Sequence, residues 1–496
     1  VSVVRFTKAV RALIVQDPQA MGVREHDVAV PVGIDVAERC AHTVDAGVGA
    51  DRHGDGHGLQ ASGQPGHAAI EQSGDKADDH ADDQKQTVIF AGSVISDADS
   101  GPSGPAVILV TDSKITGIYP ADSSDARVLS TDSGLEGKTV VDLSDKTVLP
   151  GLIDLHTHLS GDPSGEFWRA ATTPPEYSTL IAAKNARITA LAGFTTIRDL
   201  GSRTDQVTQS LRRATAEGVV PGPRVVTSGR TISIVGGHGD VSGFTRNVNE
   251  QLASGFACTG PVECAEKVRQ ASQYGADLIK ITATGGVLSQ QGRGLEAHFS
   301  NAEMVSIVET AESLGLNVAA HAHGARGIEA AASAGVQTIE HGTYIDEAAA
   351  EAMKESGTYL VPTLMAFQGI KGGLGKGVYT PIVEEKIRVV AAYADTIVER
   401  AIEFGVPIAF GTDAGVFPHG ENAGEFALMV KGGLSTKQAL ASATTVAANV
   451  LGLGDEIGQL KAGFSADIIA VDGNPLEDIT VLENVDFVMV RGRVIE

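Results

Sequence analysis

The stretch Pro150-Gly-Leu-Ile-Asp-Leu-His-Thr-His158 joins an apolar run to two histidines that are separated by one residue. Side chains alternate between the two faces of a β-strand, so residues i and i+2 face the same side. His156 and His158 can therefore point in one direction and bind one metal ion. The stretch predicts a buried strand over 148–155 with a metal-binding pair at its carboxyl end.

Further apolar runs follow this strand, and helical patterns lie between them. The runs span 194–197, 224–227, 276–281, 317–320, 337–339, 359–364 and 407–410. The capping-box sequences Ser300-Asn-Ala-Glu303 and Ser435-Thr-Lys-Gln438 predict two helix starts, and Pro261 is placed in a first helical turn. Alternating strand and helix units of this length predict an α/β fold of the (β/α)8 TIM-barrel type, whose active sites lie at the carboxyl ends of the strands.

Short β-type runs flank this region on both sides. The first set begins at Thr87, and the second includes 466–472 and 485–494. We expect the two sets to join in one small β-sandwich with the barrel inserted between them. The predicted division is 84–147 and 453–496 for the sandwich and 148–452 for the barrel.

Residues 1–83 differ in composition from the rest of the chain. They are rich in Gly, His, Asp and Gln and have no sustained apolar period, which predicts a disordered or non-native extension. Of the 14 histidines, those in this segment are His26, His42, His53, His57, His67 and His80. A metal-loading tail is the alternative interpretation.

Several other ionisable residues end predicted strands. Lys280 ends the run at 276–281, and Asp413 follows the run at 407–410. The histidines at such positions are His321, His323 and His341. Neutral imidazole and carboxylate suit Zn²⁺ and similar ions, whereas an ammonium group has no lone pair to donate. Burying these groups without a metal or partners would cost several kcal/mol, so the pattern predicts a metal centre.

The constellation resembles the amidohydrolase superfamily, and within it the imidazolonepropionase-related branch that includes Xaa-Pro and Xaa-Arg dipeptidases and ochratoxin-type amidases. The matching motifs are Pro150-Gly-Leu-Ile-Asp-Leu-His-Thr-His158, Asp277-Leu-Ile-Lys280, His321-Ala-His-Gly324, Ile339-Glu-His-Gly342, Gly411-Thr-Asp-Ala-Gly415 and the segment 458–472. The similarity covers roughly residues 87–496.

The resemblance implies a role for each matched residue. His156 and His158 would bind one metal ion, and His321 and His341 a second. Lys280, carboxylated by CO₂, would bridge the two ions. Asp413 would ligate a metal and act as general acid and base. His323 is placed beside the ligands, and the reverse assignment of His321 and His323 stays open.

Further residues are candidates for substrate contact. His238, in a glycine-rich loop, and Tyr344, which follows His341 by three positions, are expected to hold the substrate carboxylate or the reacting oxygen. His419 is a weaker candidate near the site. Arg203 and Arg293 could pair with a carboxylate, although solvation at the surface is the alternative for both. The small-residue rim that begins at Gly285 favours an apolar or proline-like leaving amino acid.

These assignments predict a binuclear metal-dependent hydrolase that cleaves a peptide or N-acyl amino acid amide bond, most simply a prolidase-like dipeptidase or carboxypeptidase. A cyclic amide hydrolase or deaminase of the imidazolonepropionase type is the alternative. Zn²⁺ is the expected ion, and Mn²⁺, Co²⁺ or Fe²⁺ would fit the same ligands. The expected partners are a small-molecule substrate and further copies of the chain in a homo-oligomer.

Charge and hydropathy exclude other classes of partner. A net charge of −24 argues against nucleic acid, and no apolar run reaches the ~18 residues of a membrane span. No secretory signal is recognisable at the amino terminus. The cysteines, Cys40, Cys258 and Cys264, are too few for a disulfide framework. Pairing of Cys258 with Cys264 is the alternative, but we expect free thiols and a cytoplasmic protein.

Overall fold

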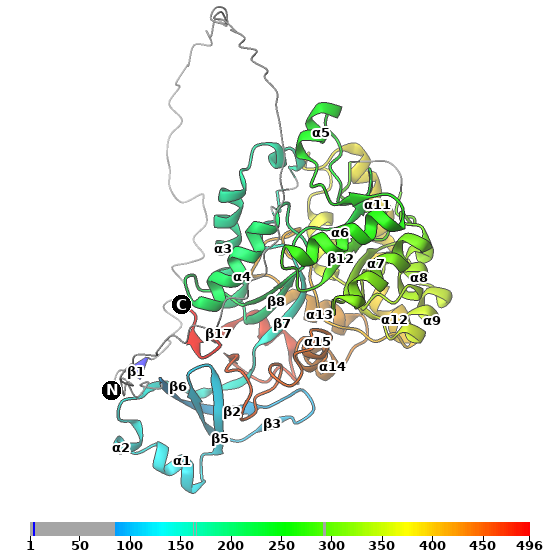
Figure 1. The fold of residues 1–496 in the computed structure, drawn as a ribbon. Helices are drawn as coiled ribbons and strands as arrows, with labels where there is room; N and C mark the ends of the chain where they lie inside the picture. The colour runs from blue at the N-terminus through cyan, green and yellow to red at the C-terminus, as the bar shows by residue number, and fades with distance from the viewer. Residues whose placement is uncertain (1–2, 5–84, 162, 165, 291–293) are drawn as a thin grey trace, which may run out of the picture. The chain divides into compact units, whose positions relative to one another are not determined.

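The computed structural model describes residues 3–4, 85–161, 163–164, 166–290 and 294–496. These residues belong to one structural unit, Val1–Thr7 with Gln84–Glu496, which has a mixed α/β fold (Figure 1). Apart from Val3–Val4, the predicted extension over 1–83 lies outside the described residues, and so do the histidines assigned to it.

One mixed sheet joins both ends of the described chain. Its order is β18-β17-β16-β6-β2-β4-β5, with β1 paired to β6 and β3 paired to β2. The strands are β1 (Val3–Val4), β2 (Gln86–Ile95), β3 (Pro102–Ser103), β4 (Ala106–Thr111), β5 (Lys114–Pro120), β6 (Thr139–Pro150), β16 (Ile468–Val471), β17 (Val485–Val490) and β18 (Arg493–Val494). The segments predicted to flank the barrel therefore meet where β16 pairs with β6.

Besides a two-stranded sheet, β10 (Ser233–Ile234) with β11 (Ala257–Cys258), the middle of the chain forms two larger parallel sheets. One has the order β7 (Leu152–Thr157), β8 (Phe194–Asp199) and β9 (Arg224–Thr227). The other has the order β12 (Ile279–Thr282), β13 (Val318–Ala322), β14 (Thr338–His341) and β15 (Tyr359–Val361). The strands of the second sheet are almost entirely buried, as parallel strands are when helices cover them.

Single bridges and hydrogen bonds extend from the edges of these two sheets. Ile232, just after β9, pairs in parallel with Ile281 of β12. At the other edge, Ile408 pairs with Leu360 of β15, and the amide of Leu155 in β7 donates to the carbonyl of Phe410 at 3.0 Å. Each edge of one sheet is thus linked to an edge of the other.

The predicted strands differ from the observed strands most clearly at three places. The run over 359–364 is a strand only as far as Val361, and Leu364 begins helix α10 (Leu364–Gly372). The run over 148–155 is split at Gly151, because its first residues belong to β6 and only the rest form β7. The run over 407–410 forms no continuous strand and is held by the bridge at Ile408 and by backbone hydrogen bonds.

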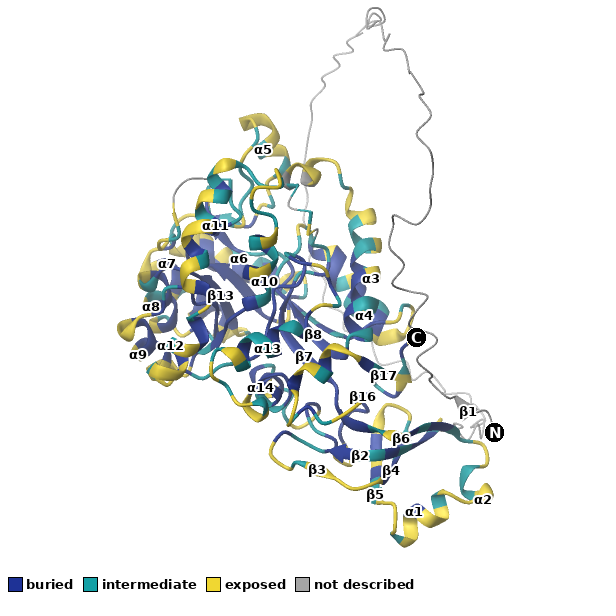
Figure 2. Cartoon of the chain, turned by 180° about the vertical axis from the view of Figure 1, so that it is seen from behind, coloured by how far each residue is buried: buried dark blue, intermediate teal, exposed yellow. Residues whose placement is uncertain are grey.

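Helices follow the parallel strands, and their outer faces are exposed while the strands are buried (Figure 2). The predicted capping boxes at Ser300 and Ser435 are confirmed, and so is the proline at the first turn of α6. The helices are α1 (Ser124–Leu129), α2 (Asp132–Leu135), α3 (Pro175–Leu191), α4 (Asp205–Glu217), α5 (Arg246–Leu252), α6 (Pro261–Gln273), α7 (Asn301–Ser313), α8 (Ala325–Ser333), α9 (Glu347–Ser356), α10 (Leu364–Gly372), α11 (Pro381–Ala394), α12 (Ile397–Phe404), α13 (Gly424–Lys431), α14 (Thr436–Ser442) and α15 (Thr445–Val450).

The expectation of free thiols is wrong for two of the three cysteines. Cys258 of β11 (Ala257–Cys258) and Cys264 of α6 form a disulfide, with both residues fully buried. The bridge closes the turn between β11 and α6, and β11 in turn pairs with β10 (Ser233–Ile234). The cytoplasmic prediction therefore loses the support that free thiols gave it.

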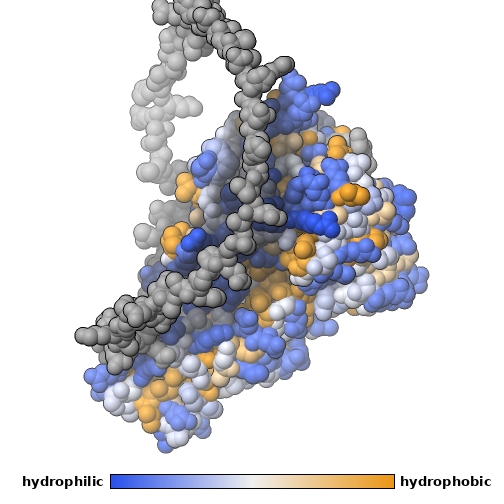
Figure 3. Space-filling model, viewed as in Figure 1, coloured by the Kyte–Doolittle hydropathy of each residue, from blue (hydrophilic) through white to orange (hydrophobic). Residues whose placement is uncertain are grey.

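Among the described residues, none of the helices has the length and apolar character that crossing a bilayer requires. The face in Figure 3 carries hydrophilic residues interspersed with smaller hydrophobic patches.

Candidate metal centre and active site

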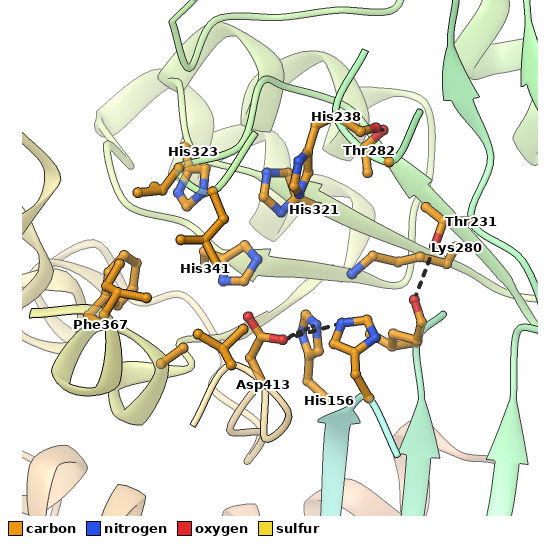
Figure 4. A pocket seen from close by; sticks show the side chains of 18 residues that line it. His156, Thr231, His238, Lys280, Thr282, His321, His323, His341, Phe367 and Asp413 are labelled. Atoms are coloured by element: carbon orange, nitrogen blue, oxygen red, sulfur yellow. Dashed lines mark hydrogen bonds and ion pairs between the residues drawn. The ribbon is translucent and has the colours of Figure 1, made fainter. Parts of the chain in front are cut away.

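The residues predicted as metal ligands meet in one cavity at the carboxyl ends of the parallel strands. They come from β7, β12, β13, β14 and the loop after 407–410, and the cavity has a volume of about 290 Å³ (Figure 4). The predicted site residues that line it are His156, His158, His238, Lys280, His321, His323, His341 and Asp413.

Two overlapping groups of side chains could each hold a metal ion. One group is His156, His341 and Asp413, and the other is His321, His323 and His341. In each group one ligand atom per residue lies within 4.8 Å of the others. We call His156, His158 and Asp413 the carboxylate half, because carboxylates contact both of its imidazoles. We call His321, His323 and His341 the hydroxyl half, because threonine hydroxyls contact two of its three imidazoles.

In the carboxylate half, a charged group lies against each imidazole. His156 Nδ1 is 2.7 Å from Glu340 Oε2, and its Nε2 is 3.4 Å from Asp413 Oδ1. His158 Nε2 is 3.3 Å from the same Asp413 oxygen, and its Nδ1 is 2.9 Å from the Gly201 carbonyl. Asp413 Oδ1 is buried, and apart from these two imidazole contacts it has no hydrogen-bond partner among the described residues.

Glu340 belongs to a fully buried ionic network. Its other oxygen, Oε1, accepts a hydrogen bond from Arg198 Nη2 at 2.9 Å. Burial alone would raise the pKa of Glu340, but Arg198 and His156 outweigh that effect and hold the pKa at about 2. Glu340 is therefore a carboxylate at neutral pH and fixes one nitrogen of His156. Burial lowers the pKa of His156 to about 4, so that imidazole is neutral.

A second buried carboxyl group ties β7 to the loop that carries Asp413. Asp154 Oδ1 accepts the amides of His156 and Thr412, and its Oδ2 accepts the Thr412 hydroxyl and the Asn422 side-chain amide. Burial raises the pKa of Asp154 to about 6 despite these donors. The amide of Asp413 also donates to the His156 carbonyl at 2.7 Å, so the two ligands are held by their backbones as well.

In the hydroxyl half, neutral groups hold the imidazoles. Nδ1 of His323 is 2.7 Å from Thr343 Oγ1, and Nδ1 of His341 is 2.7 Å from Thr363 Oγ1. His321 Nε2 is 3.2 Å from the Gly285 carbonyl. Burial lowers the pKa of His323 to about 3 and places the pKa values of the other two imidazoles well below the ordinary value, so all three are neutral.

Three non-glycine residues at the site adopt left-handed backbone conformations. They are His341 (φ 75°), Thr363 (φ 51°) and Asp413 (φ 62°). Such conformations are uncommon for residues with a Cβ and persist where the surrounding structure enforces them. Two of the three are predicted ligands, and the third bonds to a predicted ligand.

Lys280 points from β12 into the space between the two halves (Figure 4). Its side chain is buried, and among the described residues none forms a hydrogen bond or ion pair with its amine. Burial lowers the pKa of Lys280 to about 8, so an appreciable fraction of the amine is neutral at neutral pH.

His238 packs against the hydroxyl half. Its ring lies 4.3 Å from that of His321, centre to centre, and its Nδ1 is 2.6 Å from Ser289 Oγ. A Cβ at Gly286 would lie 2.3 Å from His238 Nδ1, so only glycine allows this approach. Lys386 of α11 donates to the carbonyls of Gly286 and Ser289 and thereby holds the loop that positions His238.

These observations fit a metal centre. Each imidazole of the two halves has one nitrogen fixed by a protein partner, and the other nitrogen is left for a ligand. The tautomers are inferred from those partners. A buried carboxylate oxygen without a hydrogen bond and neutral imidazoles are the donors that a divalent ion needs. Both His321 and His323 lie close enough to His341 to bind an ion together with it, so which of the two is the ligand stays open.

Other predicted contacts lie away from this cavity. The ring of Tyr344 packs on Tyr393 at 4.8 Å and is not among the described residues that line the cavity. His419 bonds to Thr189 and to the His158 carbonyl. His419 and Arg203 line a second cavity of about 680 Å³, which shares His158, Thr231 and Gly239 with the first. Arg293 lies outside the described residues.

The residues that hold the ligands are not among the predicted site residues. All three are buried: Asp154 occurs within a predicted strand, Glu340 directly beside the predicted ligand His341, and Arg198 directly after the predicted strand over 194–197. A charged residue inside an otherwise apolar strand is a signal that could have identified them, because such a residue needs a buried partner.

The chain is similar to several known proteins. The profile of the amidohydrolase family matches residues 147–495. Ochratoxinase from Aspergillus niger is 32% identical over 424 residues, which are 81% of this chain and 84% of that protein. Imidazolonepropionase from Ectopseudomonas mendocina is 25% identical over 402 residues, 74% of this chain and 86% of that protein. The crystal structure of a Xaa-Pro dipeptidase with bound methionine in the active site has a TM-score of 0.75 and 39% identity, covering 83% of this chain and 100% of that chain.

Proposed function

Because the chain belongs to the amidohydrolase family, we propose that it is a binuclear metal-dependent enzyme that hydrolyses the amide bond of a dipeptide or an N-acyl amino acid. The observation that carries the proposal is the convergence of the two metal-binding groups on one cavity around Lys280. Its similarity to a Xaa-Pro dipeptidase and to ochratoxinase supports a prolidase-like reaction.

The two halves would hold one ion each. His156, His158 and Asp413 are the proposed ligands of the first ion, and His321 and His341 those of the second. Zn²⁺ is the first choice, and Mn²⁺, Co²⁺ and Fe²⁺ suit the same donors. Bound ions of this kind lower the pKa of water and polarise a carbonyl oxygen.

Lys280 is the proposed bridge after carboxylation. Its neutral amine would add to the carbon of CO₂ and lose a proton, which gives an anionic carbamate in place of the cation. The absence of a hydrogen-bond partner among the described residues and the lowered pKa both favour the neutral amine. An anion at this position would also offset the charge of two divalent ions.

Asp413 is the proposed general base and acid. Its Oδ1 has no hydrogen bond in the described part of the chain and faces the imidazoles of the carboxylate half, where it could take a proton from the attacking water and return it to the leaving amine. His238 lines the cavity and is the proposed contact to the reacting oxygen or the substrate carboxylate. Tyr344 keeps a proposed contact only if its ring moves away from Tyr393.

A second candidate function is hydrolysis of a cyclic amide or deamination of a ring. The similarity to an imidazolonepropionase favours it, at a lower identity than the similarity to ochratoxinase. Lys280 favours the first candidate, because a bridging lysine serves a site with two ions.

The finer description of the fold is also a proposal. We infer that the bridges at Ile281 and Ile408 close the parallel strands into a (β/α)8 barrel over 148–452. We infer likewise that the mixed sheet of 84–147 and 453–496 folds over itself as a small sandwich, because residues from both segments share one apolar core that includes Ile108, Leu143 and Phe487.

The test is amide hydrolysis by protein produced with Zn²⁺ and bicarbonate. Xaa-Pro, Xaa-Arg and Xaa-Phe dipeptides and N-acyl amino acids form the panel, and released amino acids are measured before and after treatment with a chelator. Chelator-sensitive release is expected. If protein with two bound ions cleaves no member of the panel while it opens a cyclic amide or deaminates a ring, the second candidate replaces the first.

A further inference from the structure

Helix α10 forms an apolar wall of the cavity. Ala366, Phe367 and Ile370 from this helix line the cavity and are almost fully buried. The ring of Phe367 lies 6.2 Å from that of His323 and 6.3 Å from that of His341 (Figure 4). A substrate group next to Phe367 would therefore lie directly beside the hydroxyl half.

Further apolar residues line the same cavity. They are Val287, Leu288 and Val416. Within the described part of the chain, the charged residues that line this cavity are Lys280 and Asp413, and both belong to the metal centre. A charged side chain of the substrate would find no ionic partner here, and burying it unpaired is unfavourable.

The volume of the cavity limits the size of the substrate group that it can hold. A volume of about 290 Å³ is near the lower end of ligand sites, which span about 300–1,000 Å³. An apolar cavity of about 150 Å³ holds a benzene molecule. The cavity therefore has room for the scissile amide and one apolar side chain of moderate size, while the larger second cavity is left for the rest of the substrate.

The first turn of α10 is held by a residue of α13 and is connected to the metal centre. Glu425 of α13, fully buried, accepts the amides of Leu364 at 2.8 Å and Met365 at 2.7 Å. Thr363 precedes α10 and bonds to His341 Nδ1. The position of Phe367 is thus set by the same segment that orients a proposed metal ligand.

We propose that Phe367 and Ile370 of α10 determine substrate specificity by accepting an uncharged apolar residue beside the scissile bond and by rejecting Arg, Lys, Asp and Glu there. This inference rests on the proposed amide hydrolysis. It narrows the substrate to dipeptides or N-acyl amino acids whose residue at this position is apolar.

The test compares two series of dipeptides, Xaa-Ala and Ala-Xaa, in which Xaa is Ala, Leu, Phe, Glu or Arg. In the series whose variable residue occupies the position beside α10, the kcat/KM of the wild-type protein should be more than about tenfold higher for Leu than for Arg. Ile370→Glu places a carboxylate in the apolar wall and should lower that ratio at least about tenfold. Gln368→Glu adds the same charge to the exposed face of α10 and should leave the ratio unchanged.

A second variant covers the case in which Ile370→Glu does not fold. Phe367→Ala enlarges the cavity and should shift the preference from Leu towards Phe. Thermal unfolding and metal content show which variants are intact. The inference would be overturned if the wild type cleaved Arg and Leu peptides at equal rates in both series. It would also be overturned if the folded, metal-loaded variants kept the wild-type ratios of kcat/KM. Absence of cleavage of any dipeptide by the wild type would instead count against the proposed function.

Discussion

The two halves of the metal centre present the same side chain, imidazole, but hold it with different partners. In the carboxylate half, His156 bonds to the buried anion Glu340, and Asp413 lies against both histidines. In the hydroxyl half, His323 and His341 bond to threonine hydroxyls. An anionic partner makes an imidazole a stronger donor to a cation than a neutral hydroxyl does. We therefore expect the carboxylate half to bind its ion more tightly.

Asp413 provides the largest test of this difference, because it is both a proposed ligand and the proposed proton carrier. Asp413→Asn should lower kcat by about 10²–10⁴-fold, the usual contribution of a general acid or base, and leave the fold intact. Steady-state kinetics and circular dichroism check both parts. Asp395→Asn makes the same chemical change at an exposed carboxylate that pairs with Lys371 and should keep full activity. A near-normal rate for Asp413→Asn would remove the acid–base assignment.

Lys280 lies between the halves, so its loss should affect both. We expect Lys280→Ala to bind fewer than two ions per chain and to lose most of its activity, because the proposed bridge is gone. Metal content by mass spectrometry and ¹³C NMR after supply of ¹³C-bicarbonate are the measurements. The wild type should show a carbamate signal that Lys280→Ala lacks. A wild-type protein with two ions but no labelled carbamate would show that the amine is not carboxylated.

A matched pair of substitutions compares the partners of the imidazoles directly. Glu340→Gln removes the anion behind His156, and Thr363→Val removes the hydroxyl behind His341. We expect the first to weaken binding of the tighter ion by about 10–100-fold and the second to have a smaller effect on the weaker ion. Competition with a chelating dye measures both affinities.

A control for Glu340→Gln must separate a loss of stability from a loss of metal affinity. Arg198 would keep a buried positive charge without its anion, so some loss of stability is expected. Arg198→Met together with Glu340→Gln removes both charges. If the double variant regains stability but not metal affinity, Glu340 acts through His156. Equal metal affinities for the two single variants would contradict the difference between the halves.

The sequence was sufficient for the position of the ligands but not for the partners that hold them. The ligands end apolar runs, and the alternation of strand side chains places His156 and His158 on one face. Glu340 bonds to His156 across 184 residues, and no local pattern specifies a pairing at that separation. The left-handed conformations of His341 and Asp413 also depend on the surrounding structure, because a positive φ is uncommon for any residue with a Cβ, even though Asp and His adopt it more often than most.

Contacts between elements distant in sequence also account for the differences from the predictions. The ring of Tyr344, in the loop after β14, packs on Tyr393 of α11, and its contact with the substrate stays a prediction. The run over 407–410 has the apolar pattern of a strand but pairs with its neighbours at only a few positions. Cys258 and Cys264 pair because the turn between β11 and α6 brings them together, which their spacing alone did not require.

Two buried carboxyl groups, those of Glu340 and Glu425, also differ in whether their partner is charged. The prediction drawn from this difference has the smallest expected effect. Arg198 keeps the pKa of Glu340 low. Within the described residues the donors to Glu425 are backbone amides, and burial raises the pKa of Glu425 to about 8. Glu425 is therefore protonated in the folded protein over a range in which it is ionised in the unfolded chain. Stability from this group is fully present below its ordinary pKa of 4.5 and is lost as pH rises through about 8.

Glu425→Gln should remove this pH dependence, because glutamine resembles the protonated form and does not ionise. We expect the melting temperature of the wild type to fall relative to that of Glu425→Gln between pH 5 and 8 and the difference to become constant above that range. Asp154, whose pKa burial raises to about 6, titrates in both proteins and so cancels in the difference. A difference that stays constant from pH 5 upwards would show that the amides of Leu364 and Met365 keep Glu425 ionised without a cation, and the contrast with Glu340 would then not hold.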